Sequence, residues 1–126
     1  MERADAEVWL GDYIAAWKSY DRNAIAALFA EDISYRYHPY DEPMVGRDAV
    51  VASWLGEDED EPASSRDKLG TYDATYAPVA VDGDVVVAVG SSTYADPVEA
   101  YDNCFVMRFD SEGRCSEFTE WFMKRP

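Results

Sequence analysis

Glu120 and Asn103 are the polar residues whose spacing in the sequence most favours a chemical role. Residues 110–113 predict a turn between two β-rich segments, and a four-residue loop there would place Asn103 directly opposite Glu120. Phe105 and Phe118 would share that face, because side chains on one face of a strand recur at every second residue. A carboxyl group among aromatic rings is poorly solvated, so its neutral form is favoured. Glu120 could therefore accept or donate a proton near neutral pH, unless it points to solvent or only pairs with Asn103.

The opposite face of this predicted hairpin has a different character. Apolar side chains exposed among charged ones commonly bind a partner, so Val106 and Trp121 predict a homodimer through the outer face of the sheet. A slip of one residue would exchange the faces of a strand, so these predictions depend on the turn. The residues expected on the outer face are Cys104, Val106, Arg108, Glu117, Thr119 and Trp121.

Aromatic residues are numerous: the chain has nine tyrosines, four tryptophans and five phenylalanines. In a concave site a tyrosine can stack on a flat ligand and orient it through its hydroxyl, although each ring could equally pack in the core. We therefore expect a small apolar or aromatic oxygenated ligand. The side chains expected to bind it are Trp17, Tyr35, Tyr37, Trp54, Asn103, Phe105 and Phe118.

His38 is the only histidine, and imidazole normally titrates near neutral pH. If His38 and Glu120 reached the same ligand, they could divide the base and acid roles of a cyclisation or dehydration. The alternative is a surface histidine at a turn beside Asp41. Strand alternation also separates His38 from Tyr35 and Tyr37, which disfavours a place in the same pocket unless a bulge intervenes.

The charge balance restricts the partners. The 126 residues include 11 Lys and Arg against 26 Asp and Glu, which gives a formal net charge of −15. Binding to phosphates needs clustered basic side chains, so neither a nucleic acid nor an anionic membrane is expected as a partner. No apolar run approaches the ~20 residues of a membrane span, and the start, MERADAEVW, lacks a basic region followed by an apolar core. We expect one domain over residues 1–126 and a cytoplasmic location.

No motif predicts a metal or a cofactor. Cys104 and Cys115 would lie several residues apart along the hairpin, too far for a disulfide, so both are expected to be reduced. Two separated cysteines and one histidine also do not predict a zinc site. The acidic residues 57–61 lack the alternating ligands and the glycine of a calcium loop and predict a solvated loop. A glycine-rich phosphate loop and a serine nucleophile motif are also absent from the sequence.

Hydrophobic periodicity predicts the elements that position these residues. Residues 1–20 have the pattern of an amphipathic helix with Asp5 as its N-cap, and Asp21 would cap a second, shorter helix. From Asp32 onward apolar and polar residues alternate as in a half-buried strand, and residues 46–55 predict a third helix. This order predicts an α+β fold with helices on one face of a mostly antiparallel sheet. The four long strands expected after the helices are residues 71–81 and 85–94 around a turn at Asp82-Gly83, then 101–109 and 114–124.

The segment YIAAWKSYDRNAIAALFAEDISYRYHPYDEPMVGRDAV resembles the opening of nuclear transport factor 2-like proteins, within them the SnoaL-like branch and the ketosteroid isomerases. The shared features are a helix ending in an acidic turn, an LFAED-type junction into a strand, and a Pro-x-x-Gly entry into a third helix. FDSEGRCSEFTEW resembles their closing hairpin. The resemblance implies a cone: a strongly curved sheet wrapped around three helices, with an internal pocket and dimerisation through the outer sheet face. It does not imply one function, because the superfamily contains isomerases, cyclases, dehydratases, hydrolases and non-enzymatic modules.

The resemblance also implies roles for particular residues. Glu120 lies where SnoaL-like cyclases have an acid/base residue, and Tyr13 matches the oxyanion-binding tyrosine of ketosteroid isomerases, although it could be a core tyrosine. The isomerases' general-base aspartate is replaced by Tyr37 or, with a shift of one residue, by His38. Their second oxyanion donor is replaced by Phe105, so steroid isomerisation is not expected. The sequence therefore leaves two kinds of function open. One is a cofactor-independent isomerase, cyclase or dehydratase, and the other is a non-catalytic ligand-binding protein or dimerisation module.

Overall fold

The computed structural model describes residues 1–58, 61–62 and 66–126, and its elements follow the predicted order. The helices are α1 (Arg3–Ser19), α2 (Arg22–Ala27) and α3 (Arg47–Leu55). The strands are β1 (Phe29–Arg36), β2 (Met44–Val45), β3 (Glu57–Asp58), β4 (Glu61–Pro62), β5 (Tyr72–Asp82), β6 (Val85–Ala95), β7 (Val98–Phe109) and β8 (Cys115–Lys124).

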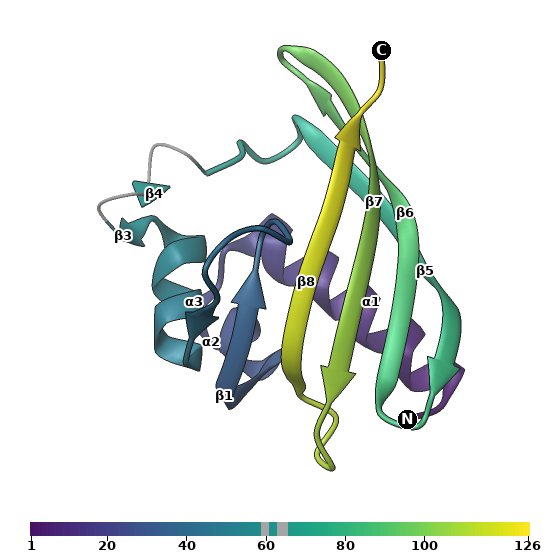
Figure 1. The fold of residues 1–126 in the computed structure, drawn as a ribbon. Coiled ribbons are helices and arrows are strands. Elements are labelled where there is room, and N and C mark those ends of the chain that lie inside the picture. The colour runs from purple at the N-terminus through teal and green to yellow at the C-terminus, as the bar shows by residue number, and fades with distance from the viewer. Residues whose placement is uncertain (59–60, 63–65) are drawn as a thin grey trace.

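The main sheet has six strands in the order β2-β1-β8-β7-β6-β5. Neighbouring strands are antiparallel except β1 and β8, which run parallel. In Figure 1, α1 lies behind the long strands, and α2 and α3 lie beside β1. The predicted α+β class, with a curved and mostly antiparallel sheet around three helices, is therefore confirmed.

The core lies between α1 and the concave face of the sheet. Trp9 and Tyr13 are buried on one side of α1 because residues four apart face the same way on a helix. They contact the buried ring of Phe118 on β8, with ring centroids 6.5 and 5.9 Å away. The indole nitrogen of Trp9 donates a hydrogen bond of 3.0 Å to the Leu28 carbonyl, which fixes α1 to the end of α2.

The helix starts agree in part with the prediction. Asp21 caps α2 through a 2.9 Å hydrogen bond from the Ala24 N–H, as expected. Asp5, the predicted cap of α1, is instead the third helical residue; Glu2 is the cap, and the two side chains bond each other's backbone in a capping box. The first strand also begins earlier than predicted, because Phe29 already pairs with Cys115 on β8.

The register of the last hairpin differs from the prediction by two residues. Glu120 faces Phe105, whereas the sequence predicted Asn103 directly opposite it. The loop includes one more residue than expected, and a bulge follows between Arg108 and Phe109. The longer loop and the bulge each shift the pairing by one residue. A total shift of two residues leaves every side chain on its predicted face, so Asn103, Phe105 and Glu120 still share the inner face.

Three further features complete the fold. The first long hairpin turns at Gly83-Asp84 rather than Asp82-Gly83, and Gly83 has a φ of 61°, which glycine adopts readily. The bulge places Cys115 in the core, and both cysteines are free, as expected. Strands β3 and β4 pair within the stretch predicted as an acidic loop, of which residues 59–60 lie outside the described residues. No helix in the described part of the chain is long and apolar enough to span a membrane.

Candidate active site

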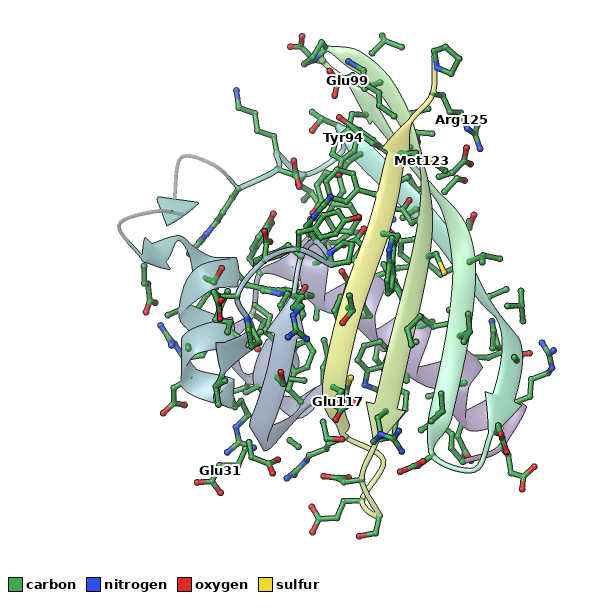
Figure 2. All side chains as sticks on the ribbon, in the orientation of Figure 1. Glu31, Tyr94, Glu99, Glu117, Met123 and Arg125 are labelled. Atoms are coloured by element: carbon green, nitrogen blue, oxygen red, sulfur yellow. The ribbon has the colours of Figure 1, made fainter. Side chains whose placement is uncertain are left out.

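A pocket of about 260 Å³ lies between the helices and the concave face of the sheet. This volume is slightly below the ~300–1,000 Å³ typical of small-molecule sites. In Figure 2 Tyr94, one of its lining residues, lies near the upper end of the long strands, whereas Glu31 lies at the opposite end of the molecule. The lining residues are Tyr13, Trp17, Tyr20, Tyr35, Tyr37, Trp54, Asp67, Tyr76, Ser92, Tyr94, Tyr101, Asn103, Glu120 and Phe122.

Most residues predicted for the site come together in this pocket. Two predicted ligand-binding residues, Phe105 and Phe118, do not line it but lie beneath it, each 1% exposed. Phe118 stacks on Tyr35 with ring centroids 4.6 Å apart, and Phe105 lies 5.4 Å from Tyr13. The predicted residues that do line the pocket are Tyr13, Trp17, Tyr35, Tyr37, Trp54, Asn103 and Glu120.

Glu120 is held at the sheet side of the pocket by a chain of hydrogen bonds across three strands. The Ser92 hydroxyl donates to the amide oxygen of Asn103 at 3.0 Å, and the Asn103 amide nitrogen donates to Glu120 Oε2 at 2.8 Å. Burial raises the pKa of Glu120 from 4.5 to about 7, and the Asn103 hydrogen bond opposes this only in part. The carboxyl is therefore suited to exchange a proton near neutral pH.

Two tyrosines from different elements lie next to this carboxyl. Tyr13 comes from the buried side of α1 and Tyr35 from β1. Burial raises the pKa of both phenols well above the usual value, and the nearby Glu120 carboxylate adds to each shift. Both hydroxyls therefore keep their protons at neutral pH and can donate a hydrogen bond to an oxygen atom.

Trp54 contributes an unsatisfied donor. Its ring packs edge-on against Tyr13, with centroids 5.2 Å apart, and its Nε1 is buried without a hydrogen-bond partner among the described residues. The Tyr35 hydroxyl lies near this N–H without the geometry of a hydrogen bond. A buried donor left unpaired costs about 1–3 kcal/mol, so a ligand oxygen placed there would be stabilised.

The other end of the pocket is closed by Asp67. Its carboxylate accepts a 3.0 Å hydrogen bond from Trp17 Nε1, and its backbone N–H donates a 3.0 Å bond to the Tyr20 hydroxyl. Burial raises the pKa of Asp67, which the Trp17 N–H partly offsets. The Tyr72 hydroxyl, 2.9 Å from the Trp17 carbonyl, fixes the same end of α1 to β5. Loop 66–70 is thus bound to α1 by side chains rather than by regular structure.

His38, the third predicted catalytic residue, does not line this pocket. It follows the end of β1, and its Nδ1 accepts a 3.3 Å hydrogen bond from the Tyr40 backbone N–H. Its ring lies 6.1 Å from the ring of Phe122, in a second pocket that shares Asn103 and Phe122 with the first. The structure therefore places His38 in the surface turn given above as the alternative, beyond the end of β1, where its carbonyl accepts a 3.0 Å hydrogen bond from the Asp41 N–H.

Several lining residues were not predicted. Ser92 and Tyr94 follow the two-residue alternation of β6, and Tyr101 follows that of β7, so the period that selected Asn103 could have selected them as well. Asp67 had no such signal, because it lies in a loop without periodicity. The remaining unpredicted members are Tyr20, Tyr76 and Phe122. No group of three or more His, Cys, Asp or Glu side chains could hold a metal ion within the described ranges.

The chain belongs to the SnoaL-like domain family, whose model matches residues 10–118. It is similar in structure to an LEH-like epoxide hydrolase of M. tuberculosis, with a TM-score of 0.68 and 14% identity over 98% of this chain and 86% of that one. It is also similar to a ketosteroid isomerase-like protein of Kribbella flavida DSM 17836, with a TM-score of 0.68 and 17% identity over 98% and 82% of the two chains. At such identities the likeness concerns the fold alone, and no curated protein matches the sequence.

Proposed function

We propose that the pocket binds a small apolar oxygenated molecule and transfers a proton on it without a cofactor, with Glu120 as the acid/base group. The observation that carries this proposal is the position of the Glu120 carboxyl in an aromatic pocket, with one oxygen held by Asn103 and a pKa of about 7. A carboxyl with this pKa is substantially populated in both protonation states near neutral pH.

The chemistry would be the enolisation of a ketone. The Glu120 carboxylate removes a proton from the carbon next to the carbonyl. The electron pair of that C–H bond forms a C=C bond, and the π pair of the carbonyl moves to oxygen, which gives an enolate. The Tyr13 hydroxyl and the unpaired Trp54 N–H would donate hydrogen bonds to this oxygen as its charge develops. Protonated Glu120 then returns the proton to a carbon atom, which gives an isomer. In a ring closure the enolate carbon would instead attack a second carbonyl of the same molecule, and protonated Glu120 would give its proton to the alkoxide formed there.

Proton exchange tests this proposal directly. Small cyclic and aryl ketones are incubated with the protein in D2O, and NMR measures deuterium incorporation next to the carbonyl. We expect Glu120→Gln to slow this exchange by about 10²–10⁴-fold, because the variant cannot accept a proton. Tyr13→Phe should slow it by about 10²–10³-fold, because one donor to the enolate is lost.

Glu117→Gln is the matched control. Glu117 lies on β8 too, but its side chain is exposed and pairs with Arg108 outside the pocket. This variant should exchange at the wild-type rate. Equal rates for wild type, Glu120→Gln and Tyr13→Phe would remove both residues from the mechanism.

A second candidate is a protein that holds its ligand without changing it. The observation that favours it is Phe105, fully buried at the position where the isomerases have a second oxyanion donor. Mass spectrometry of a ligand mixture before and after incubation distinguishes the two functions. Recovery of every bound compound at its original mass supports binding alone, and an altered mass supports catalysis.

We also propose that the protein forms a homodimer through the outer face of its sheet. Val89, Cys104 and Trp121 are register neighbours across β6, β7 and β8 on that face. Val89 and Trp121 are 42% and 44% exposed, and Val106 lies nearby on β7 with 37% exposed. An apolar patch of this kind commonly binds a second copy.

A further inference from the structure

The charges in the pocket are all of one sign. Two carboxyl groups line it, Glu120 beside the sheet and Asp67 near the end of α1, and no Lys, Arg or His is among its described lining residues. Each carboxyl has a neutral donor as its side-chain partner, Asn103 for Glu120 and Trp17 for Asp67. When both carboxyl groups are ionised, as expected above pH 7, the site is anionic, and no described lining residue supplies a counter-charge.

The basic side chain next to Asp67 in the sequence is engaged elsewhere. Arg66 precedes Asp67, but its guanidinium nitrogens donate to the Leu55 carbonyl and it lies 5.3 Å from the centroid of the Tyr20 ring. Arg66 does not line the pocket. Asp67 also retains a raised pKa, which indicates that no nearby cation fully compensates for its burial.

The walls between the two carboxyl groups are aromatic. Burial raises the pKa of the Tyr94 phenol, and both Asp67 and Glu120 add to this shift, so Tyr94 lies near both carboxyl groups. Its ring lies 6.3 Å from Trp17 and 5.7 Å from Tyr101. Tyr101 in turn lies 6.0 Å from Phe122. The face of an aromatic ring carries a negative partial charge and attracts a cation within ~6 Å of its centre. Rings and carboxylates together therefore favour positive charge and disfavour an anion.

We propose that the ligand of this pocket is an amine-bearing molecule whose protonated or quaternary nitrogen lies between Asp67, Glu120 and the aromatic walls. Its oxygen atom would bind at the other polar contact, the unpaired Trp54 N–H beside Tyr13. This inference depends on the proposed function only in taking the same pocket as the ligand site. It would hold equally for a catalyst and for a binding protein.

Carboxylate and phosphate ligands are disfavoured by the same charges. An anion in this pocket would meet two carboxyl groups at short range and no basic side chain from the lining set. It would also approach a chain whose formal net charge is −15. Burying a charge without a partner of opposite sign is strongly unfavourable, so anions should bind most weakly. A neutral molecule is not attracted by the two carboxyl groups as a cation is, so it should bind more weakly than a cation.

The test compares three probes of similar size at pH 8. Phenyltrimethylammonium is the cation, tert-butylbenzene is its neutral isostere, and benzoate is the anion. Affinities are measured by titrating tryptophan fluorescence and are checked by ligand-observed NMR. We expect the cation to bind about fivefold or more tightly than the neutral isostere, and benzoate to bind weakest.

Asp67→Asn is the informative variant, because asparagine keeps an oxygen for the Trp17 N–H while it removes the charge. It should lower the affinity for the cation by about fivefold and leave the affinity for tert-butylbenzene unchanged. Asp73→Asn is the control: it removes the same charge from the exposed carboxylate that pairs with Lys18. This control should bind the cation like wild type.

Three outcomes would overturn the inference: tert-butylbenzene or benzoate binding as tightly as the cation, equal losses in the two variants, or no binding of any probe. The last outcome would also contradict the proposed function, because it would remove the ligand site itself. The first two would leave that function intact, since proton exchange on neutral ketones depends on Glu120 and not on the charge of the ligand.

Discussion

The Glu120 carboxyl is subject to two opposing effects. Burial among aromatic rings favours its neutral form, whereas the Asn103 amide favours the ionised form, and burial has the larger effect on the pKa. Unfolding transfers the carboxyl to water, where it ionises near pH 4.5. The folded state is therefore destabilised progressively as pH rises from 4.5 to about 7, and the loss is complete above pH 7.

Glu120→Gln should remove this pH-dependent loss. Glutamine resembles the neutral carboxyl, so the variant should match wild type at pH 4.5 and be about 3 kcal/mol more stable at pH 8. Urea unfolding at both pH values measures the difference, with Glu117→Gln as a control for the removal of one charge. The same stability difference at both pH values would contradict a raised pKa at Glu120.

The sequence predicted some residues of the site and missed others for a physical reason. Glu120 and Asn103 share a face because of strand alternation, which survives a register error of two residues. The unpaired Trp54 N–H was not predictable, because it depends on how rings pack in three dimensions. Asp67 was missed because hydrogen bonds to Trp17 and Tyr20 determine its position, and a loop residue has no helical or strand periodicity that would predict it.

At the scale of elements, the periodicity of the sequence was sufficient to predict the three helices and the four long strands. Periodicity did not predict the register of the last hairpin, because the loop length and the bulge at Arg108 cannot be read from the alternation of apolar and polar residues. The two-residue strand β2 was missed because so short a segment has no measurable period.

Gly90 of β6 lies beside the pocket where the neighbouring strand leaves no room for a side chain. It pairs with Tyr76, and a Cβ atom there would lie 1.9 Å from the Thr75 carbonyl oxygen and 2.7 Å from the Tyr76 ring. The absence of a side chain lets β5 and its tyrosine come close to β6.

Gly90→Ala should therefore destabilise the protein by about 2 kcal/mol or more and weaken ligand binding, because Tyr76 must move. Thermal unfolding and probe titration measure the two effects. The control is Gly11→Ala on the exposed side of α1, where a Cβ atom meets nothing within 4 Å. That change should stabilise the protein by about 0.5–1 kcal/mol through helix propensity. Equal stability of the two variants would show that β5 and β6 tolerate the extra atom.

At the scale of the whole molecule, the net charge of −15 limits how two copies can meet. Most acidic side chains must remain outside any interface, since like charges at close range repel each other. The proposed dimer face satisfies this condition at its centre, where Val89, Cys104 and Trp121 are adjacent.

Light scattering at micromolar concentration should detect a dimer, and raised salt should not dissociate it, because salt screens the repulsion between copies. Trp121→Glu should yield monomers by adding charge to the centre of the face. Val8→Glu is the control, because Val8 is exposed on α1, away from the sheet face. A wild-type protein that is monomeric under these conditions, or a Trp121→Glu variant that stays dimeric, would contradict the proposed interface.

The position of β8 between β1 and β7 also has a consequence during biosynthesis. Before β8 is made, β1 and β7 each present an unpaired edge, and the buried side chains Phe29 and Phe105 lack their partners on that strand. A nascent chain that has not yet released β8 from the ribosome would therefore be prone to aggregation and dependent on chaperones. Because Glu120 is part of β8, the acid arrives with the same segment that joins the two parts of the sheet.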